Sequence, residues 1–310
     1  MRTCVVFNPV AKGQKAERFR RQLDVIGATC ALKQTTAPDD ARRLAAEAVR
    51  EGFELVIAAG GDGTINEVLN GIGDAPDGFT GACLGVLPLG TVNVFARELG
   101  IPLAVEKAWA AIRAGRETRV DLPCVEFTTG GTRQRRYFAQ LAGAGLDARA
   151  IELVSWSHKK RVGPLAYIVA GLKALAGKLP QIRAASGAQS SAGELVLIGN
   201  GRLYGGNYEI SPQADLRDGL LDVCVFPRAG WLTLGRCALP LLVRGKIPAA
   251  SVQRFQAETF TLTSEFAAPF ELDGELIGQL PATFSIERNR LRVLVPQRRP
   301  GPPVHGRKLF

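Results

Sequence analysis

A glycine-rich segment that follows a short apolar run is the part of the sequence best suited to bind phosphate. Residues 54–70 read E-L-V-I-A-A-G-G-D-G-T-I-N-E-V-L-N, so an apolar strand stops at Gly60, Gly61 and Gly63, and helical spacing begins near Ile65. Glycine lets the backbone bend and lets a ligand approach the amides, and amides at a helix N-terminus attract anions. The segment predicts a phosphate-binding turn, with an ordinary strand-to-helix turn as the alternative.

Asp62 lies in the middle of this turn, where a carboxylate would repel a phosphate. A cation between the two groups, or a proton on the carboxylate, removes that repulsion. The position of Asp62 therefore predicts Mg²⁺-assisted phosphoryl chemistry rather than simple anion binding. Thr64 and Asn66 add polar groups at the same place.

Strands and helices alternate through the first third of the chain. This alternation indicates a parallel sheet covered by helices, and ligands bind such sheets at the carboxyl ends of the strands. Polar loops over residues 8–13, 60–64 and 88–93 follow three of the strands, so we expect them to converge on one cleft. The predicted strands cover residues 3–7, 29–33, 55–59 and 84–87, and the predicted helices cover 15–26, 39–50, 92–99 and 104–114.

From about Arg119 the pattern changes to short strands with a period of two, which is typical of a β-sandwich. We therefore predict two domains, residues 1–120 and 121–295, with a basic, proline-containing tail (296–310) that could pack back on the first. Residues 186–193, rich in Ser, Ala and Gly, are predicted to form a mobile loop. The predicted strands cover 137–141, 194–198, 221–226, 259–263 and 282–286, and the predicted helices cover 148–157, 165–176 and 231–243.

The 310 residues carry a formal net charge of +10, with basic clusters within 18–21, 133–136, 159–161 and 298–308. Nucleic acid, an anionic membrane or a phosphorylated small molecule would each suit such a surface. No nucleic-acid-binding motif is recognisable, so we expect no nucleic-acid partner.

Six cysteines are scattered without a C-x-x-C pair, and the chain has two histidines, so we expect reduced thiols of a cytoplasmic protein rather than a zinc site. No signal peptide is apparent. The longest apolar stretches, 165–176 and 231–243, fall short of the roughly 20 residues that a spanning helix needs. Any contact with a membrane is therefore expected from outside the bilayer.

Beyond the single glycine turn, a series of motifs in one order along nearly the whole chain resembles the diacylglycerol kinase catalytic-domain family, which includes soluble prokaryotic lipid kinases and the sphingosine and ceramide kinases. G-G-D-G-T alone is also similar to NAD kinases and phosphofructokinases, whereas the full series is specific. The motifs are N-P at residues 8–9, G-G-D-G-T-I-N-E-V-L-N-G at 60–71, L-P-L-G-T-V-N-V-F-A-R-E-L-G-I-P at 87–102, F-A-Q-L-A-G-A-G-L-D-A at 138–148, N-G-R-L-Y-G-G-N at 200–207, S-P-Q-A-D-L-R-D-G-L-L-D-V at 211–223 and L-D-G-E at 272–275.

The resemblance implies an N-terminal α/β nucleotide domain of the NAD kinase or phosphofructokinase type and a C-terminal β-sandwich domain that accepts a lipid, with the active site between them. Loop amides and threonine hydroxyls would donate to the phosphates of ATP, and Asp62 would organise Mg²⁺ and charge around the transferred group. For Thr91, a helix N-cap is the alternative role. The residues implied to bind ATP are Asn8, Pro9, Val10, Ala11, Lys12, Thr36, Gly60, Gly61, Asp62, Gly63, Thr64, Ile65, Asn66 and Thr91.

Glu275, in D-G-E, aligns with the general base proposed for the family, and a carboxylate beside the acceptor can take the proton of an attacking alcohol. Without the resemblance, Asp273 and Gly274 would indicate a hairpin with Glu275 as a surface residue. Asp215, Asp218 and the carbonyl of Leu220 match a second, structural Mg²⁺ site, with an acidic turn as the alternative.

Asp121 and Asp147 are weaker candidates for a charge network at the domain boundary. Two departures from the family pattern leave the identity of the acceptor open. Lys12 occupies the usual glycine position of the first loop, and Val94 stands where an acidic residue is frequent.

Residues 158–178 combine a basic entry with an apolar face, which suits docking on an anionic bilayer and equally suits a core helix with a solvated end. We expect a cytoplasmic, peripherally membrane-associated kinase that transfers phosphate from ATP to a lipid such as diacylglycerol. The alternatives are a kinase of a soluble alcohol, as in NAD kinase, and a catalytically silent nucleotide- or lipid-binding regulator. The oligomeric state stays open, a homodimer included.

Overall fold

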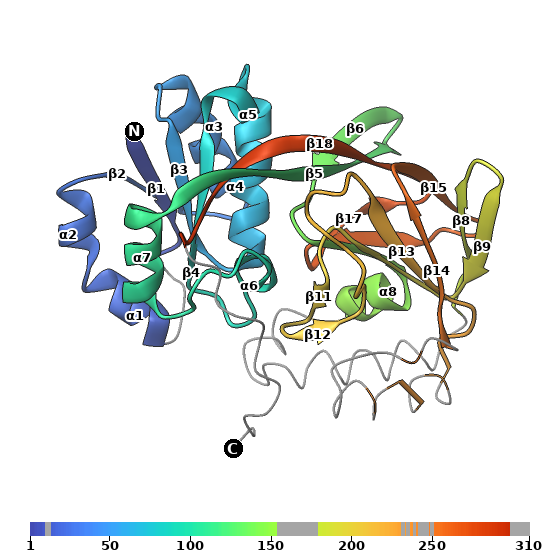
Figure 1. Ribbon diagram of the computed structural model, residues 1–310. Helices are drawn as coiled ribbons and strands as arrows, with labels where there is room; N and C mark the ends of the chain where they lie inside the picture. The colour runs from blue at the N-terminus through green and yellow to red at the C-terminus, as the bar shows by residue number, and fades with distance from the viewer. Residues whose placement is uncertain are drawn as a thin grey trace.

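Two lobes lie side by side and are joined by a pair of long strands, β5 (Arg116–Thr129) and β18 (Ala282–Val295), in the computed structural model (Figure 1). The structure describes residues 1–9, 14–153, 179–230, 233, 236, 237, 240, 248 and 251–297. β5 and β18 pair antiparallel along almost their whole length, from Ala282 opposite Phe127 to Val295 opposite Arg116. The chain therefore enters the second lobe on β5 and returns to the first on β18.

The first lobe is built on parallel strands in the order β2-β1-β3-β4, and the end of β18 pairs parallel with β4. Helices cover both faces of this sheet (Figure 1), and its strands β1, β3 and β4 are accordingly apolar and almost entirely buried. The α/β fold predicted for this half is confirmed. Its strands are β1 (Thr3–Phe7), β2 (Ala31–Gln34), β3 (Leu55–Gly60) and β4 (Cys83–Pro88), and its helices are α1 (Gln14–Arg20), α2 (Leu23–Gly27), α3 (Asp40–Arg50), α4 (Asp62–Asp74), α5 (Gly78–Gly81), α6 (Val94–Glu98) and α7 (Val105–Ala114).

Three helix predictions in this lobe need correction. The helix expected over residues 15–26 is two segments, α1 and α2, separated by a turn at residues 21–22. The helix expected to begin near Ile65 begins at Asp62, so the second half of the glycine turn is already helical. The N-cap position of α6 is Asn93, in a left-handed conformation with φ 53°, and Thr91 is therefore not the cap.

The second lobe is a β-sandwich, as predicted. One sheet has the order β14-β13-β10-β7-β16-β17. The other continues from β18 through β15 and β8 to β9, with β5 also paired to β18 and β6 paired to β5. Their inner faces share an apolar core in which the rings of Phe260 and Phe284 stack at 5.3 Å and Phe270 packs edge-on to Phe284. The further elements are β6 (Thr132–Tyr137), β7 (Leu141–Gly145), α8 (Leu146–Leu153), β8 (Ile182–Ser186), β9 (Gln189–Gly193), β10 (Leu195–Gly199), β11 (Leu203–Tyr204), β12 (Tyr208–Glu209), β13 (Leu221–Phe226), β14 (Gln253–Ala257), β15 (Thr259–Ser264), β16 (Pro269–Leu272) and β17 (Glu275–Gln279).

Some predictions in this lobe were wrong. Residues 137–141, expected as a strand, mostly connect β6 to β7. Residues 186–193, expected as a mobile loop, form the turn and second strand of the β8–β9 hairpin, in which Ser186 pairs with Gln189. The predicted helices over 165–176 and most of 231–243, and the tail from residue 298, lie outside the described residues.

The predicted boundary between residues 120 and 121 falls inside β5, which runs through both lobes, and it remains a prediction. In the part of the chain that the structure describes, no helix combines the length and the apolar character needed to cross a membrane.

The contact between α3 and α4 gives a test of the packing that supports the glycine turn. A Cβ at Gly71 of α4 would lie 2.1 Å from the carbonyl oxygen of Arg42 in α3. We expect Gly71→Ala to lower the free energy of unfolding by about 1–3 kcal/mol through overpacking, although alanine favours helix. Urea unfolding measures this effect. Gly81→Ala is the control, because a Cβ at Gly81 would meet nothing within 4 Å; equal stability of the two variants would contradict the packing argument.

Candidate functional site

The loops that follow the parallel strands meet at one edge of the sheet. Phe7 at the end of β1 pairs with Ala59 of β3 and with Gln34 of β2, and Gly60 pairs with Pro88 at the end of β4. The residues that come next along each strand therefore start from the same edge. The described parts of the polar loops therefore start side by side, as predicted, and their convergence on one cleft remains a prediction.

Two of these loops touch through their backbones, and glycine makes the contact possible. A Cβ at Gly90 would lie 2.6 Å from the Cα of Gly61, and a Cβ at Gly60 would lie 2.3 Å from the hydroxyl of Thr64. No side chain caps α4 at its Gly61 N-cap position. The amides of the first helical turn have no helical carbonyl as partner, so they are the donors that an anion at this edge would meet.

Asp62 lies half-buried in the first turn of α4, between α6 and the second lobe. Its Oδ1 accepts a weak hydrogen bond from the amide of Phe95, with an N–O distance of 3.4 Å. Burial raises the pKa of Asp62, amides at the start of α6 oppose the rise, and the negative charge of Asp273 adds to it. A cation or a proton would therefore stabilise this carboxyl group, as its place in the sequence suggests.

Glu275, the first residue of β17, reaches across from the second lobe to the start of α4. A Cβ at Gly63 would lie 2.5 Å from Oε1 of Glu275, so the carboxylate contacts the backbone of the glycine turn directly. The Glu275 side chain is otherwise exposed. Its charge contributes, after burial, to the raised pKa of Glu67 on α4. The structure thus brings together the two residues that the sequence singled out for chemistry, Asp62 and Glu275.

Asp273 connects the turn that carries Glu275 to α4 through hydrogen bonds, a role that sequence reasoning did not identify. Its carboxylate accepts hydrogen bonds from the amides of Ala139 (2.7 Å), Gln140 (3.0 Å) and Leu141 (3.1 Å) and from the side-chain amide of Asn66 (2.8 Å). The sequence signal was the Asp-Gly dipeptide, which indicates a turn but not this role. Asp273 indeed has a left-handed φ of 48°, and its carboxylate ties the turn to α4.

Asn66 and Asn70 of α4 also form hydrogen bonds that connect this helix to the second lobe. Asn70 exchanges two hydrogen bonds with the backbone of Tyr137, each 2.9 Å long, as a neighbouring strand would. Asn66 is buried and directs its amide nitrogen at Asp273, while Ile65 lies in the core and its backbone N–H donates to Gly61. ATP binding by Asn66 and Ile65 remains a prediction that their side-chain contacts do not support.

The N-terminus of the neighbouring helix α3 is occupied by carboxylates of the protein itself. The amide and hydroxyl of Thr36 donate to Oδ2 of Asp40 at 2.7 and 2.5 Å, and these hydrogen bonds lower the pKa of Asp40. Glu67 accepts a hydrogen bond from the amide of Ala41. Binding of phosphate by Thr36 therefore requires it to exchange Asp40 for the ligand, whereas the first turn of α4 needs no such exchange.

The remaining residues predicted to bind ATP are placed as follows. Thr91 is exposed and follows Gly90 at the contact between the two glycine loops. Asn8 and Pro9 follow β1, and the carbonyl of Pro9 accepts a hydrogen bond from Arg20. Val10, Ala11 and Lys12 lie outside the described residues, so the unusual lysine of this loop stays a sequence observation.

The predicted structural Mg²⁺ site is a tight acidic turn before β13. Asp215 and Asp218 each accept a hydrogen bond from a loop amide two residues later, at 3.1 and 2.9 Å. Burial, then Asp215 and Asp121, raise the pKa of Asp218, so a cation would stabilise the ionised form. The structural Mg²⁺ site remains a prediction, in which Asp215, Asp218 and the Leu220 carbonyl would supply the hard oxygen donors that this ion prefers.

Asp121, a weaker candidate for a charge network, is buried and clamps this turn to β18. Its two carboxylate oxygens accept hydrogen bonds from the amides of Gly219 (2.7 Å) and Asn289 (2.6 Å). Among the described residues, no group of three or more His, Cys, Asp or Glu side chains is arranged to hold a metal. A cation on either acidic site would therefore depend on carbonyl, water or phosphate oxygens as well.

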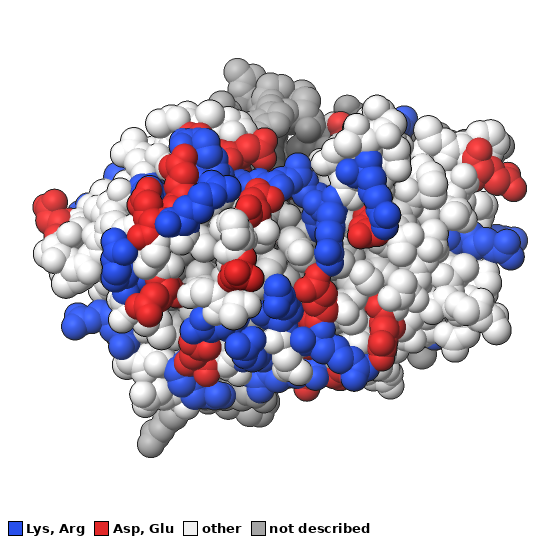
Figure 2. Space-filling view, turned by 90° about the horizontal axis from the view of Figure 1, so that it is seen from above, with Lys and Arg blue, Asp and Glu red and all other residues white. Residues whose placement is uncertain are grey.

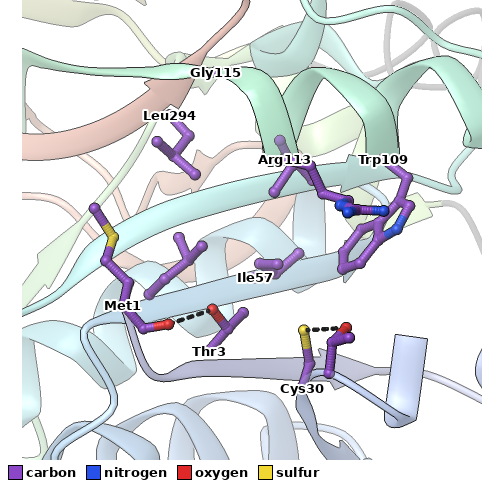
Figure 3. A pocket seen from close by; sticks show the side chains of 11 residues that line it. Met1, Thr3, Cys30, Ile57, Trp109, Arg113, Gly115 and Leu294 are labelled. Atoms are coloured by element: carbon purple, nitrogen blue, oxygen red, sulfur yellow. Dashed lines mark hydrogen bonds between the residues drawn. The ribbon is translucent and has the colours of Figure 1, made fainter. Parts of the chain in front are cut away.

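A pocket of about 370 Å³ lies elsewhere in the first lobe (Figure 3). Thr3 and Leu55, at the starts of β1 and β3, line it together with Trp109 and Arg113 of α7. Because parallel strands start at the edge opposite their carboxyl ends, this pocket is separate from the glycine turn and from Glu275.

Comparison with known proteins agrees with this geometry. The family model described as the diacylglycerol kinase catalytic domain matches residues 2–125, and the one described as the YegS C-terminal NAD kinase beta sandwich-like domain matches residues 140–295. Proteins named diacylglycerol kinase from Staphylococcus carnosus and Staphylococcus saprophyticus are each 31% identical to this chain, covering 96% and 95% of it and 95% of each relative. A crystal structure of a diacylglycerol kinase from Bacillus anthracis shares the fold, with a TM-score of 0.69 and 18% identity over 96% of this chain and 97% of that one.

The Asp273 joint can be tested through stability. Asp273→Asn keeps the shape and tolerates the left-handed φ, but it turns an amide group toward donors that need an acceptor. We expect a loss of about 1–3 kcal/mol in the free energy of unfolding, measured by urea denaturation. Asp77→Asn is the control, because Asp77 also has a left-handed φ (53°) before a glycine but is exposed. Equal stability of the two variants would show that Asp273 does not hold the lobes.

Proposed function

We propose that this chain, which belongs to the diacylglycerol kinase family, transfers the γ-phosphate of ATP to the hydroxyl of a lipid such as diacylglycerol, giving phosphatidic acid. Family membership establishes that it is a kinase acting on a hydroxyl acceptor. The lipid acceptor and the assignment of residues are the proposed part. The observation that carries the residue assignment is the contact of Glu275 with the backbone of Gly63.

In the proposed reaction, Glu275 acts as the general base. It takes the proton of the acceptor hydroxyl while the acceptor oxygen forms a bond to the γ-phosphorus and the bond from that phosphorus to the β-phosphate oxygen breaks, releasing ADP. The first-turn amides of α4 bind and orient the phosphates. Because Glu275 contacts this same turn, base and phosphoryl group share one site without movement of the lobes.

Mg²⁺ is the cation that we infer for this site. Asp62 would hold it beside the triphosphate, where bound Mg²⁺ neutralises phosphate charge, and the turn of Asp215, Asp218 and Leu220 would hold a second, structural ion. The raised pKa values of Asp62 and Asp218 support both assignments, since a cation stabilises a carboxylate that burial disfavours.

Two features support an apolar acceptor. Leu276, directly after Glu275 in the second lobe, is 41% exposed. Val92, two residues after Gly90, is 38% exposed. A kinase of a soluble alcohol remains the alternative, and the contact between the Asp62 turn and Glu275 argues against a catalytically silent regulator.

We also propose that the protein is cytoplasmic and binds the surface of an anionic membrane peripherally. Figure 2 shows that Lys and Arg on one face are interspersed with Asp and Glu. Of the basic cluster 133–136, Arg133 pairs with Glu126 and Arg135 with Glu287, so two of its three arginines are already paired within the protein. Residues 158–178, the segment predicted to dock, lie outside the described residues. We propose no nucleic-acid partner, and a homodimer stays a prediction.

Glu275→Gln tests the base. Glutamine has the same size but cannot accept the acceptor proton, so we expect kcat to fall about 10²–10⁴-fold, with the KM for ATP and the unfolding midpoint almost unchanged. Gly63→Ala, which pushes the flexible tip of Glu275 aside, should also lower kcat. Glu265→Gln, at an exposed position of the second lobe, is the control. Wild-type kcat in Glu275→Gln would remove Glu275 from the mechanism.

The acceptor is identified by a transfer assay with ATP labelled in its γ-phosphate. The full chain is given, in turn, anionic vesicles containing diacylglycerol, the same vesicles without it, glycerol and NAD. We expect labelled phosphatidic acid and no label in the water-soluble acceptors. Label in NAD or glycerol alone would favour the soluble-alcohol kinase, and no transfer to any acceptor would contradict the proposed function.

A further inference from the structure

Two carboxyl groups meet in the interior of the second lobe, below the turn that carries Glu275. Asp147 of α8 and Glu271 of β16 converge over Gly143 of β7, where a Cβ would lie 2.5 Å from Oδ2 of Asp147 and 2.8 Å from Oε1 of Glu271. Glu271 is fully buried. Among the described residues, Oε1 of Glu271 has no hydrogen-bond donor beside it, and the group that it faces is the carboxyl group of Asp147.

The other oxygen of each group has a fixed partner. The hydroxyl of Tyr204 on β11 donates to Oδ1 of Asp147 at 2.7 Å, and the amide of Gly274 donates to Oε2 of Glu271 at 2.6 Å. Among the described residues, the charged groups that raise the pKa of Glu271 are Asp147 and Asp273, both of which are acidic. Neither carboxyl group of the pair forms an ion pair with a Lys or an Arg that the structure describes.

Two carboxylates cannot both be ionised in such a place, because burial and mutual repulsion add. Burial, and then the charge of Asp147, raise the pKa of Glu271 well above its usual range. Burial also raises the pKa of Asp147, but its hydrogen bonds from Tyr204 and Glu271 oppose the rise. The proton therefore belongs on Glu271, which donates to Asp147.

We propose that Glu271 is a protonated positioning residue that donates to Asp147 through one oxygen and holds the amide of Gly274 with the other, so that the turn aims Glu275 at the glycine loop. Gly274 has a φ of 91° and directly precedes Glu275, so its amide fixes the backbone from which Glu275 extends. The part of this inference that concerns catalysis rests on the proposed function; the shared proton does not.

The shared proton predicts a particular dependence of stability on pH. The folded chain keeps a proton on Glu271 at pH values where an unfolded glutamate, with a pKa of about 4.3, has lost it. Stability from this proton is therefore complete at low pH and declines as the pH rises from there toward the raised pKa of Glu271. Glu271→Gln keeps both hydrogen bonds, because its amide nitrogen donates to Asp147 and its oxygen accepts from Gly274, but it has no proton to lose.

Urea unfolding of the full wild-type chain and of Glu271→Gln between pH 5 and pH 8 tests the proton. We expect the ratio of the wild-type unfolding constant to that of the variant to rise by up to about tenfold per pH unit. Glu117→Gln is the matched control: Arg292 lowers the pKa of Glu117, so its ratio should stay flat in this range. A flat ratio for Glu271→Gln would overturn the shared proton.

The positioning role is tested by activity in the same variants. We expect Glu271→Gln to keep kcat close to wild type, and Glu271→Leu, which loses both hydrogen bonds, to lose about 10²-fold in kcat without a change in the KM for ATP. Wild-type kcat in a folded Glu271→Leu would overturn positioning. Should Glu271→Leu not fold, loss of kcat in the milder Glu271→Gln would overturn it instead. An inactive wild type would refute the proposed function, while the unfolding ratio would still test the pair.

Discussion

The Asp273 carboxylate joins the two lobes beside the glycine turn and Glu275, the site proposed for phosphoryl transfer. It accepts hydrogen bonds from Asn66 of α4 and from three successive amides, 139–141, and its own backbone N–H donates to Leu141. Burial raises the pKa of Asp273, and the four donors that point at its two oxygens oppose this rise because they stabilise the charged form. Glu275 follows two residues later, so its contact with Gly63 depends on this joint.

The contact that Asp273 makes between the lobes is supported by the paired strands β5 and β18, which limit how far the lobes can move relative to each other. β5 and β18 run together through both lobes, so relative movement of the lobes would have to bend a paired ribbon. Four acidic groups lie near the N-terminus of α4, namely Asp62, Glu67, Asp273 and Glu275. A cation would stabilise such a concentration of negative charge, which supports the Mg²⁺ proposed for this site. A functional site is where local stability is expected to give way to binding.

The sequence predicted the parts of this structure that depend on local pattern. Alternation gave the strands of the first lobe to within about two residues, and the D-G-E motif pointed to Glu275 through its family resemblance. The Asn66–Asp273 bond joins residues 207 positions apart, and no periodicity encodes such a pairing. Residues 186–193 were wrongly expected to be mobile because their small polar side chains resemble a linker, whereas pairing with β8 orders them.

Three carboxyl groups within five residues show how strongly environment, rather than residue type, sets their roles. Glu271 faces another carboxyl group, with no cation beside it among the described residues, and retains the proposed proton. Asp273 faces N–H groups and accepts from all of them, and Glu275 reaches the exposed edge where α4 begins. The two glutamates of this segment thus differ in their surroundings, because Glu271 is buried against a second carboxyl group whereas Glu275 is exposed. Because Glu271 and Asp273 fix the backbone on either side of Gly274, the turn can present Glu275 with the same geometry in every catalytic cycle.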